Sequence, residues 1–411
     1  MLLGLLKEIH PGETRVALTP ANVEALCRRK LSVLVEAGAG IQAGYSDDSY
    51  RAAGAEIADS REQIFARTDI VVLVQSFVGN LKNGGKELAL LKKAQLLIGM
   101  LDPLGQIEQV PVLAGAGVTA LALELVPRIS RAQSMDVLSS MATIAGYKAV
   151  LTGAAALGRL MPLMMTAAGT LKPARVFIMG AGVAGLQAAA TAKRLGAVVE
   201  AYDVRSAARE QILSVGAKPI ELELPTDLAE GQGGYAKAQG EDFLRHQREQ
   251  MGGVLAQQDL VITTAAVPGA KSPVLITTEM VQQMKPGAVI VDLAAERGGN
   301  CELTRLGETV VANGVTIIGP DNIASTVPYH ASQMYGKNLE NLLLHMVDKE
   351  GQLQLDFGDE IIAQTVMSHS GNIVQPMLRE RLGLDNALVE ELSPAAEAAA
   401  PGVEIREVER V

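Results

Sequence analysis

The sequence predicts an α/β protein in which two doubly wound parallel sheets form two domains. Short apolar runs alternate with helical patterns through the first third of the chain, and a second series of the same kind begins at Arg175. A long alanine-rich helical pattern precedes the second series, and another helical pattern follows it. Strands that alternate with helices are typical of parallel sheets. With 411 residues and 48% hydrophobic content, the chain has enough material for two or three domains with buried cores.

The first series predicts five strands, because each short apolar run is bounded by turn or helix signals. These strands are expected at 2–6, 32–36, 69–75, 94–101 and 118–124. A helix is expected to begin at Thr19-Pro20, with threonine as the N-cap and proline in the first helical position.

The second series predicts six further strands, and two helices bracket it. The strands are expected at 175–179, 197–202, 218–222, 259–265, 288–293 and 315–319, and the helices at about 135–161 and 332–348. The chain should therefore cross to a second domain and return. We expect an N-terminal domain of residues 1–137 with 329–375, a second domain of 138–328, and a tail of 376–411. The alanine, proline and glutamate content of the tail indicates a linker or disorder.

Composition excludes several classes of protein. A net charge of −10, 3% aromatic residues and no tryptophan argue against a nucleic-acid partner. Cys27 and Cys301 lie far apart without a cysteine–histidine cluster, which argues against a disulfide scaffold and against a metal site. Lys148 and Arg159 interrupt the best candidate for a membrane span. We therefore expect a cytoplasmic chain without a membrane span of its own.

A glycine motif opens the second series. Gly180, Gly182 and Gly185 have the spacing G-x-G-x-x-G between a predicted strand and a predicted helix, and Asp203 ends the next strand. This context is the dinucleotide-binding fingerprint of a Rossmann-like domain, with the pyrophosphate at the helix N-terminus. A carboxylate at Asp203 favours NAD over NADP, whereas a nearby Arg205 could hold a 2′-phosphate. We expect the cofactor to lie in a cleft between the two domains.

A polar segment directly precedes the alanine-rich helix. Arg128, Gln133, Asp136 and Ser139 supply the donors and acceptors that a nicotinamide carboxamide needs, and the arginine could neutralise a pyrophosphate. The alternative is an ordinary capped helix start, with Ser134 or Asp136 as the N-cap and solvated arginines.

A glycine-rich insertion at 225–240 contains one aromatic residue, Tyr235. Such composition usually forms a surface loop. The alternative is a lid that hinges at its glycines and closes Tyr235 over a ligand.

Three motifs together carry a family resemblance. They are Arg128-Ile-Ser-Arg-Ala-Gln-Ser-Met-Asp136, Gly233-Gly-Tyr235-Ala-Lys, and the stretch 268–302. Over about residues 1 to 375 the chain resembles the alpha subunit of proton-translocating NAD(P) transhydrogenase, in the alanine dehydrogenase/transhydrogenase superfamily. The resemblance implies a dimeric subunit that binds NAD(H). Its bound NADH would pass hydride to NADP⁺, as the NADP(H) cofactor held on a partner subunit, and that partner system has a membrane subunit that moves protons. Because the chain ends without membrane helices, it resembles the split form of this enzyme.

The resemblance also implies residue roles. It gives catalytic roles to Arg128, Gln133, Asp136, Ser139 and Tyr235. It gives cofactor contacts to Arg128, Ile129, Ser130, Arg131, Gln133, Gly180, Gly182, Val183, Gly185, Asp203, Val204, Arg205, Gly234, Ala265 and Ala266.

The start of the chain is similar to alanine dehydrogenase, and the departures from that family are informative. Gln75 stands where that family carries a substrate-binding lysine, Asp102 where it carries a catalytic histidine, and Glu296 where it carries an aspartate. An amino-acid dehydrogenase must move a proton as well as a hydride. Hydride transfer between two nicotinamides needs only close approach and fixed ring faces. The departures therefore favour transhydrogenation and leave Arg15, the family's substrate-carboxylate ligand, structural or vestigial. An alanine dehydrogenase-like enzyme and a non-catalytic NAD-binding module remain the alternatives.

Overall fold

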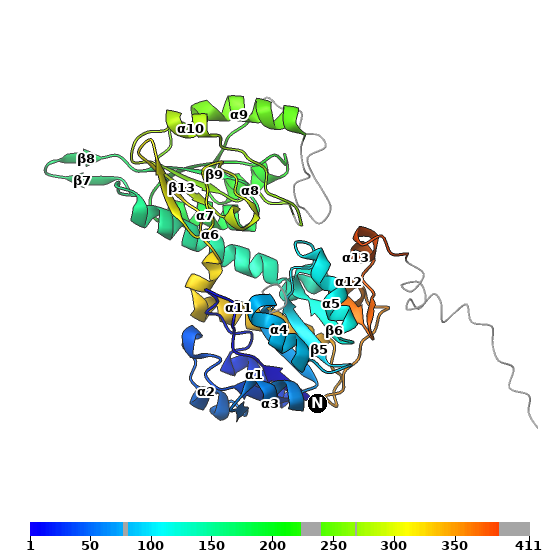
Figure 1. Cartoon of the computed structure of the whole chain (residues 1–411). Helices are drawn as coiled ribbons and strands as arrows, with labels where there is room; N and C mark the ends of the chain where they lie inside the picture. Colours follow the sequence, from blue (N-terminus) through cyan, green and yellow to red (C-terminus); the bar gives the residue numbers. More distant parts are fainter. Residues whose placement is uncertain (77–80, 223–239, 268, 386–411) are drawn as a thin grey trace, which may run out of the picture.

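The computed structural model describes residues 1–76, 81–222, 240–267 and 269–385, and it contains two α/β units, each built around its own sheet (Figure 1). The first sheet has eight strands in the order β17-β16-β6-β5-β4-β1-β2-β3, and the second has seven in the order β11-β10-β9-β12-β13-β15-β14. In each sheet the strand order reverses beside a central strand, β1 or β9, which is the doubly wound arrangement. The predicted fold class is therefore confirmed.

Parallel pairing joins β1 to β6, and an antiparallel pair extends the first sheet at one edge. The strands are β1 Leu2–Leu5, β2 Ser32–Glu36, β3 Glu56–Ala58, β4 Ile70–Gln75, β5 Leu96–Met100, β6 Thr119–Ala122, β16 Val366–His369 and β17 Asn372–Ile373. All five strands predicted from the first series are present. The central strands β4 and β5 are buried nearly throughout, which is why they read as continuous apolar runs.

The second sheet is parallel except at its last strand, where β14 pairs antiparallel with β15. Its strands are β9 Arg175–Met179, β10 Val198–Tyr202, β11 Lys218–Pro219, β12 Leu260–Thr263, β13 Val289–Asp292, β14 Thr309–Ala312 and β15 Val315–Ile318. All six predicted strands are present. The patterns do not predict β3, β14, β16 and β17, because these are short or partly exposed strands without a run of buried apolar side chains.

Helices cover the two sheets. In the first unit they are α1 Pro20–Arg28, α2 Asp47–Ala52, α3 Arg61–Arg67, α4 Leu81–Leu90, α5 Val110–Gly115, α11 Pro328–His345, α12 Glu360–Thr365 and α13 Pro376–Arg381. In the second unit they are α7 Val183–Arg194, α8 Ala208–Ser214, α9 Glu241–Leu255 and α10 Thr278–Gln283. The start of α1 is as predicted, with Pro20 in the first position and the backbone N–H of Thr19 donating to Asn22 Oδ1 at 2.9 Å.

Helix α6, Val137–Ala156, passes from one unit to the other (Figure 1). Its first half contributes Val137 and Met141 to the core beneath the first sheet, and its second half contributes Ala149 and Val150 to the core of the second unit. The helix is shorter than predicted at both ends. Asp136 caps its N-terminus, and Gly158 and Pro162 follow its end, where glycine and proline disfavour further helix.

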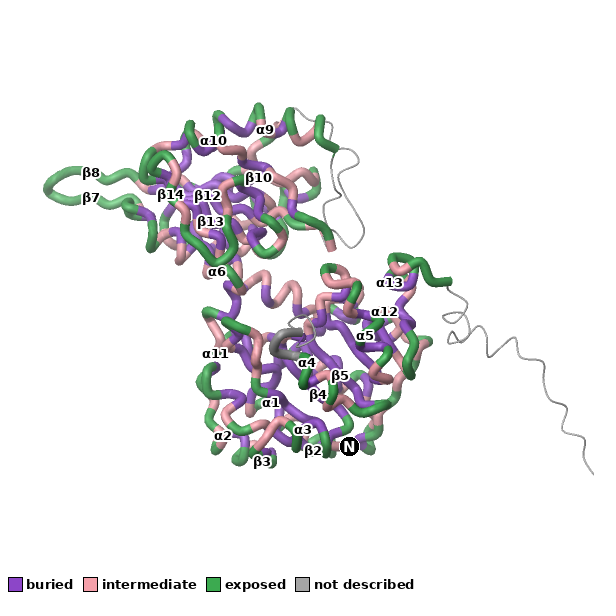
Figure 2. Tube along the Cα trace, viewed as in Figure 1, coloured by how far each residue is buried: buried purple, intermediate pink, exposed green. Residues whose placement is uncertain are grey.

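Residues 157–161, predicted as the last helical turn, are irregular, and a hairpin that the sequence did not predict follows them. Strands β7 Met164–Thr166 and β8 Gly169–Leu171 pair antiparallel and project from the second unit (Figure 2). All their residues are exposed, so neither burial nor strand alternation marks them in the sequence.

The return to the first unit also differs in detail from the prediction. Helix α11 begins earlier than expected because Pro328 occupies its first position, and it ends at His345. Residues 376–381, assigned to the tail from sequence, form α13, whose Leu378 is fully buried. Residues 386–411 lie outside the described part of the chain. Within the described residues, no helix combines the length and the apolar character needed to span a membrane.

Helices α6 and α7 cross at very close range. A Cβ atom added to Gly146 of α6 would lie 2.1 Å from the carbonyl oxygen of Ala184 in α7. Only glycine at this position lets the two backbones approach so closely. The crossing therefore sets the position of α7, and of the glycine motif at its start, relative to α6.

We expect Gly146→Ala to destabilise the second unit by about 2 kcal/mol, because overpacking against backbone costs roughly 1–3 kcal/mol. The midpoint of thermal unfolding should fall, and the gain in helix propensity should recover only part of the loss. Gly158→Ala is the matched control, since an added Cβ there meets nothing within 4 Å. Equal midpoints for Gly146→Ala and the wild-type chain would contradict the close crossing.

Candidate functional site

The glycine motif forms the turn from β9 into α7. Gly180 has φ +101, a backbone conformation that side chains disfavour, and a Cβ atom on Gly185 would lie 1.8 Å from the carbonyl oxygen of Gly180. Gly182 is the N-cap of α7, and a Cβ atom there would meet nothing within 4 Å. Val183 follows it and is partly exposed. Two glycines thus build the turn, while the third leaves open space at a helix N-terminus that fits a phosphate group.

Asp203 directly follows β10, and its carboxylate is fully engaged. Its Oδ1 accepts from Nε and from the backbone N–H of Arg205 at 2.9 and 2.8 Å. Its Oδ2 accepts from the backbone N–H of Ala181 at 2.7 Å and from Arg205 Nη2 at 2.9 Å. The acid at the strand end therefore both holds the glycine turn and binds Arg205 in a two-point ion pair. The hollow beside this pair has a volume of about 240 Å³, and Val204 also lines it.

The polar segment before α6 forms the 3₁₀ helix η5, Ser130–Met135, and leads into the N-terminus of α6. Asp136 is the N-cap: its Oδ1 accepts from the backbone N–H of Ser139 at 2.9 Å, and its Oδ2 accepts from the hydroxyl of Ser139 at 2.6 Å. Arg128 Nε lies 3.9 Å from Asp136 Oδ2. The structure thus brings Arg128, Asp136 and Ser139 together, and of the two interpretations of this segment it confirms the N-cap role of Asp136.

Other predicted residues of this segment point elsewhere or stay exposed. The guanidinium of Arg131 donates to Asp359 at 3.0 Å, at the start of α12. Gln133 and Ser130 are exposed, and Ile129 is partly buried against the core of the first unit. Ser134 anchors the segment, because its carbonyl accepts from the side-chain amides of two asparagines of α11, Asn338 and Asn341.

The carboxyl ends of the two sheets face each other across the boundary between the units. Asp102 follows β5 of the first sheet, Arg297 follows β13 of the second, and their side chains form an ion pair at 2.5 Å. Ala265 and Ala266 follow β12 at the same end of the second sheet, and Ala266 is exposed. Gly234 and Tyr235, with the rest of the proposed lid, lie outside the described residues.

A buried polar cluster lies at the carboxyl end of the first sheet. Arg15 donates to both carboxylate oxygens of Glu13, from Nε at 2.8 Å and from Nη2 at 2.6 Å. Gln75 and Asn322 donate to the same carboxylate at 3.0 and 2.9 Å. Burial alone would raise the pKa of Glu13, but the hydrogen bonds and charge of Arg15 lower it to about 2. Arg15 is thus neutralised within the protein.

Two further carboxyl groups, which were not predicted as site residues, hold adjacent strand ends. Glu8 accepts from the backbone N–H groups of Val74 and Gln75 at 2.6 and 3.2 Å, after β4. Glu124 accepts from the backbone N–H groups of Leu101 and Asp102 at 3.1 and 2.8 Å, after β5. Burial raises the pKa of Glu8 to about 8 and that of Glu124 to about 7. Their position within three residues of the ends of β1 and β6 was the available signal.

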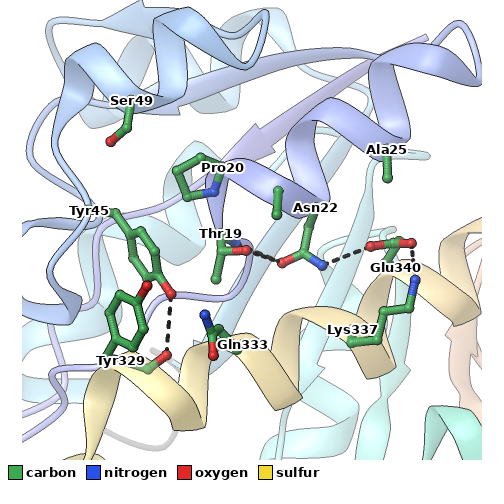
Figure 3. Close-up of a pocket in the computed structure, with 11 residues that line it drawn as sticks. Thr19, Pro20, Asn22, Ala25, Tyr45, Ser49, Tyr329, Gln333, Lys337 and Glu340 are labelled. Atoms are coloured by element: carbon green, nitrogen blue, oxygen red, sulfur yellow. Dashed lines mark hydrogen bonds and ion pairs between the residues drawn. The ribbon is translucent and has the colours of Figure 1, made fainter.

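A separate groove of about 610 Å³ lies between α1 and α11 (Figure 3). Tyr45 and Tyr329 stack at its edge with ring centroids 5.0 Å apart. At its floor Asn22 donates to Glu340 at 2.8 Å, and Lys337 pairs with the same carboxylate. None of the predicted site residues lines this groove. The predicted site therefore lies elsewhere, at the facing sheet ends.

Comparisons with known proteins show the family to which the chain belongs. The family model "Alanine dehydrogenase/PNT, N-terminal domain" matches residues 4–145, and the corresponding C-terminal domain matches residues 149–376. An NAD(P) transhydrogenase subunit alpha of Rhodospirillum rubrum, the first of the pieces into which that subunit is divided, is 48% identical over 380 residues, covering 92% of this chain and 99% of that protein.

Two more comparisons cover the two kinds of enzyme in the family, a transhydrogenase and an alanine dehydrogenase. A solved transhydrogenase structure from Sinorhizobium meliloti has 40% identity and a TM-score of 0.78, covering 92% of this chain and all of that one. The alanine dehydrogenase of Bacillus subtilis is 31% identical over 338 residues, covering 80% of this chain and 81% of that protein. The chain therefore belongs to the alanine dehydrogenase/PNT family, and within it resembles NAD(P) transhydrogenase alpha subunits more than alanine dehydrogenase.

Proposed function

We propose that this chain is the NAD(H)-binding subunit of an NAD(P) transhydrogenase, which passes hydride from NADH to NADP⁺ on a partner subunit. One observation carries the proposal. The dinucleotide turn and the Arg128–Asp136–Ser139 cluster are present, whereas the family resemblance would place Gln75 and Asp102 where alanine dehydrogenases carry a lysine and a histidine. Both are also engaged, Gln75 with Glu13 and Asp102 with Arg297.

The part of the proposed site at the start of α7 and the end of β10 has the groups that would bind a dinucleotide. The open space at Gly182 and the N–H groups at the start of α7 would receive the pyrophosphate. Asp203 and Arg205, with Val204 between them, would meet the adenosine ribose. Ala265 and Ala266 stand on the adjoining strand end, on the side expected for the nicotinamide.

The segment at the start of α6 would fix the nicotinamide ring. Asp136 orients the hydroxyl of Ser139, and the exposed amide of Gln133 supplies a donor and an acceptor for the carboxamide. Arg128 adds a positive charge, held near Asp136. NADH itself supplies the hydride, so these side chains need only hold the ring face and exclude water. We assign the lid role to Gly234 and Tyr235 as a prediction from the family resemblance.

The partners follow from the same proposal. NADP(H) would be held by a second subunit that docks at the facing sheet ends, and a membrane subunit would couple the transfer to proton translocation. The chain would then work in the cytoplasm, bound peripherally to the membrane through this partner. We also propose a homodimer, because hairpin β7–β8 exposes an apolar surface that a second copy could cover. Met165 is 76% exposed and Leu163 56%.

Cofactor preference tests the role of Asp203. The wild-type chain should bind NADH more tightly than NADPH. Arg205→Ala should raise this preference by about tenfold, because an unpaired carboxylate repels a 2′-phosphate more strongly. Asp203→Ala should reduce the preference for NADH over NADPH. Calorimetric titration of both cofactors measures the ratio, with Arg245→Ala, an exposed arginine on α9, as the control. A fall in preference on Arg205→Ala would show that Arg205 itself holds the 2′-phosphate.

The partner assay tests the reaction. NADH oxidation should be negligible with pyruvate and ammonia, because the position of the substrate-binding lysine holds Gln75 and that of the proton donor holds Asp102. It should become rapid when a transhydrogenase domain loaded with NADP⁺ is added. Rapid turnover with pyruvate and ammonia alone would favour the amino-acid dehydrogenase. Binding of NADH without transfer to any loaded partner domain would favour the non-catalytic module.

The hydride-transfer assay with the partner domain also tests the role of Asp136. Asp136→Ala should slow hydride transfer by about a hundredfold while weakening NADH binding much less, since small misplacement of a reacting group is this costly. Asp48→Ala, on the exposed start of α2, is the control. Equal losses in binding and transfer would make the segment a structural helix start only.

The hairpin tests the dimer. Sedimentation should give twice the chain mass for the wild type, and a double variant Leu163→Ser, Met165→Ser should sediment as a monomer, because the apolar area that drives association is gone. Val311→Ser removes an equally exposed apolar side chain from β14, 68% exposed, and should leave the dimer intact. A wild-type monomer would overturn this part of the proposal.

A further inference from the structure

Asn300 makes an unusual set of contacts with the loop that follows β12. Its Oδ1 accepts from the backbone N–H of Ala265 at 3.0 Å, and its Nδ2 donates to the carbonyl oxygen of the same residue at 2.8 Å. The second Nδ2 hydrogen goes to the carbonyl of Pro273 at 2.9 Å. Because both hydrogens meet carbonyl oxygens, only one orientation of the amide satisfies the network.

The side chain of Asn300 is itself rigidly placed. The residue is fully buried, and its backbone N–H donates to Asp292 Oδ2 at 2.7 Å. Asp292, also fully buried, accepts from Thr263 and Thr304 as well, which joins the end of β13 to the end of β12. A buried network in which every member is satisfied holds its groups in one arrangement. The position of Ala265 is therefore held by Asn300 and Asp292, which lie outside the loop that contains Ala265.

The consequence falls on the next residue. Both backbone polar groups of Ala265 are used by Asn300, whereas Ala266 is exposed and its backbone N–H and carbonyl contact no described residue. The hydroxyl of Thr264 meanwhile donates to the carbonyl of Gly180 at 3.0 Å, which ties this loop to the glycine turn. Backbone groups that form no hydrogen bond within the described part of the chain thus stand beside the turn that would receive the pyrophosphate, at the switch point between β9 and β12.

We propose that Asn300 is a positioning residue for the nicotinamide half of the cofactor. By holding both polar groups of Ala265, it presents the backbone of Ala266 to the nicotinamide ring. The proposal rests on the proposed NAD(H) site. It assigns Asn300 no contact with the adenosine half, which meets Asp203 and Arg205 at the end of a different strand.

Binding of two ligands, NADH and ADP-ribose, distinguishes this positioning role from a general structural role. Asn300→Ser removes the two-point contact without burying a charge, and it should weaken NADH binding by about tenfold, since a misplaced hydrogen-bonding group loses most of its worth. ADP-ribose lacks the nicotinamide, so the variant should bind it with an affinity within about twofold of that of the wild-type chain. Asn372→Ser, on the exposed strand β17 of the other unit, is the control.

Hydrogen exchange supplies a measurement that needs no cofactor. The amide of Ala265 should exchange faster in Asn300→Ser than in the wild type, while the amides of β12 keep their protection. Asn300→Asp, which sets a carboxylate oxygen against the carbonyls of Ala265 and Pro273, should have the larger effect on NADH. Equal losses for NADH and ADP-ribose, or no loss for either, would overturn the proposal. Because the chain is tested alone, failure of the partner assay would leave this result standing.

Discussion

The close crossing of α6 and α7 is the contact on which the arrangement of the site depends. Gly146 lets the backbones of the two helices meet, and each helix carries half of the proposed site at its N-terminus. Asp136 begins α6, and Gly182 begins α7. Since α6 is buried in both cores, a shift at the crossing would move the residues proposed to hold the nicotinamide relative to the turn proposed to receive the pyrophosphate. Gly146 and Gly185 both allow close backbone approach, Gly146 where α6 crosses α7 and Gly185 within the glycine turn.

Several acidic side chains in this protein hold backbone in place by accepting hydrogen bonds. Glu8 and Glu124 accept N–H groups at the ends of β4 and β5, and Asp203 does the same for the glycine turn. Such carboxyl groups satisfy donors that a parallel sheet leaves unpaired at its end. Arg15 in turn is neutralised by Glu13. The first unit thus presents an internally paired face to the second, as would suit the proposed hydride transfer, which needs placement and no proton transfer.

The two units are joined at more than the helices that cross between them. The ion pair of Asp102 and Arg297 links the end of β5 to the end of β13, and a Cβ atom on Gly105 would lie 2.0 Å from the arginine. The partners are partly exposed, so solvent weakens the pair. The ion pair matters for the arrangement of the units more than for stability. It holds the carboxyl ends of the two sheets face to face, where a cofactor and its acceptor would have to meet.

The sequence by itself determined the fold class, the predicted strands of both sheets and the dinucleotide turn. Buried parallel strands are continuous apolar runs, and a glycine turn at a helix start needs its glycines at set spacing, so both leave local signals. The edge strands and the hairpin β7–β8 leave none, because they bury no apolar face of their own. Contacts between distant residues were decided only by tertiary structure. The hydrogen bond of Asp203 with the backbone of Ala181, the two-point contact of Asn300 with Ala265 and the ion pair of Arg131 with Asp359 depend on which backbone groups and charges remain unpaired once the sheets have formed, and no spacing along the chain encodes that.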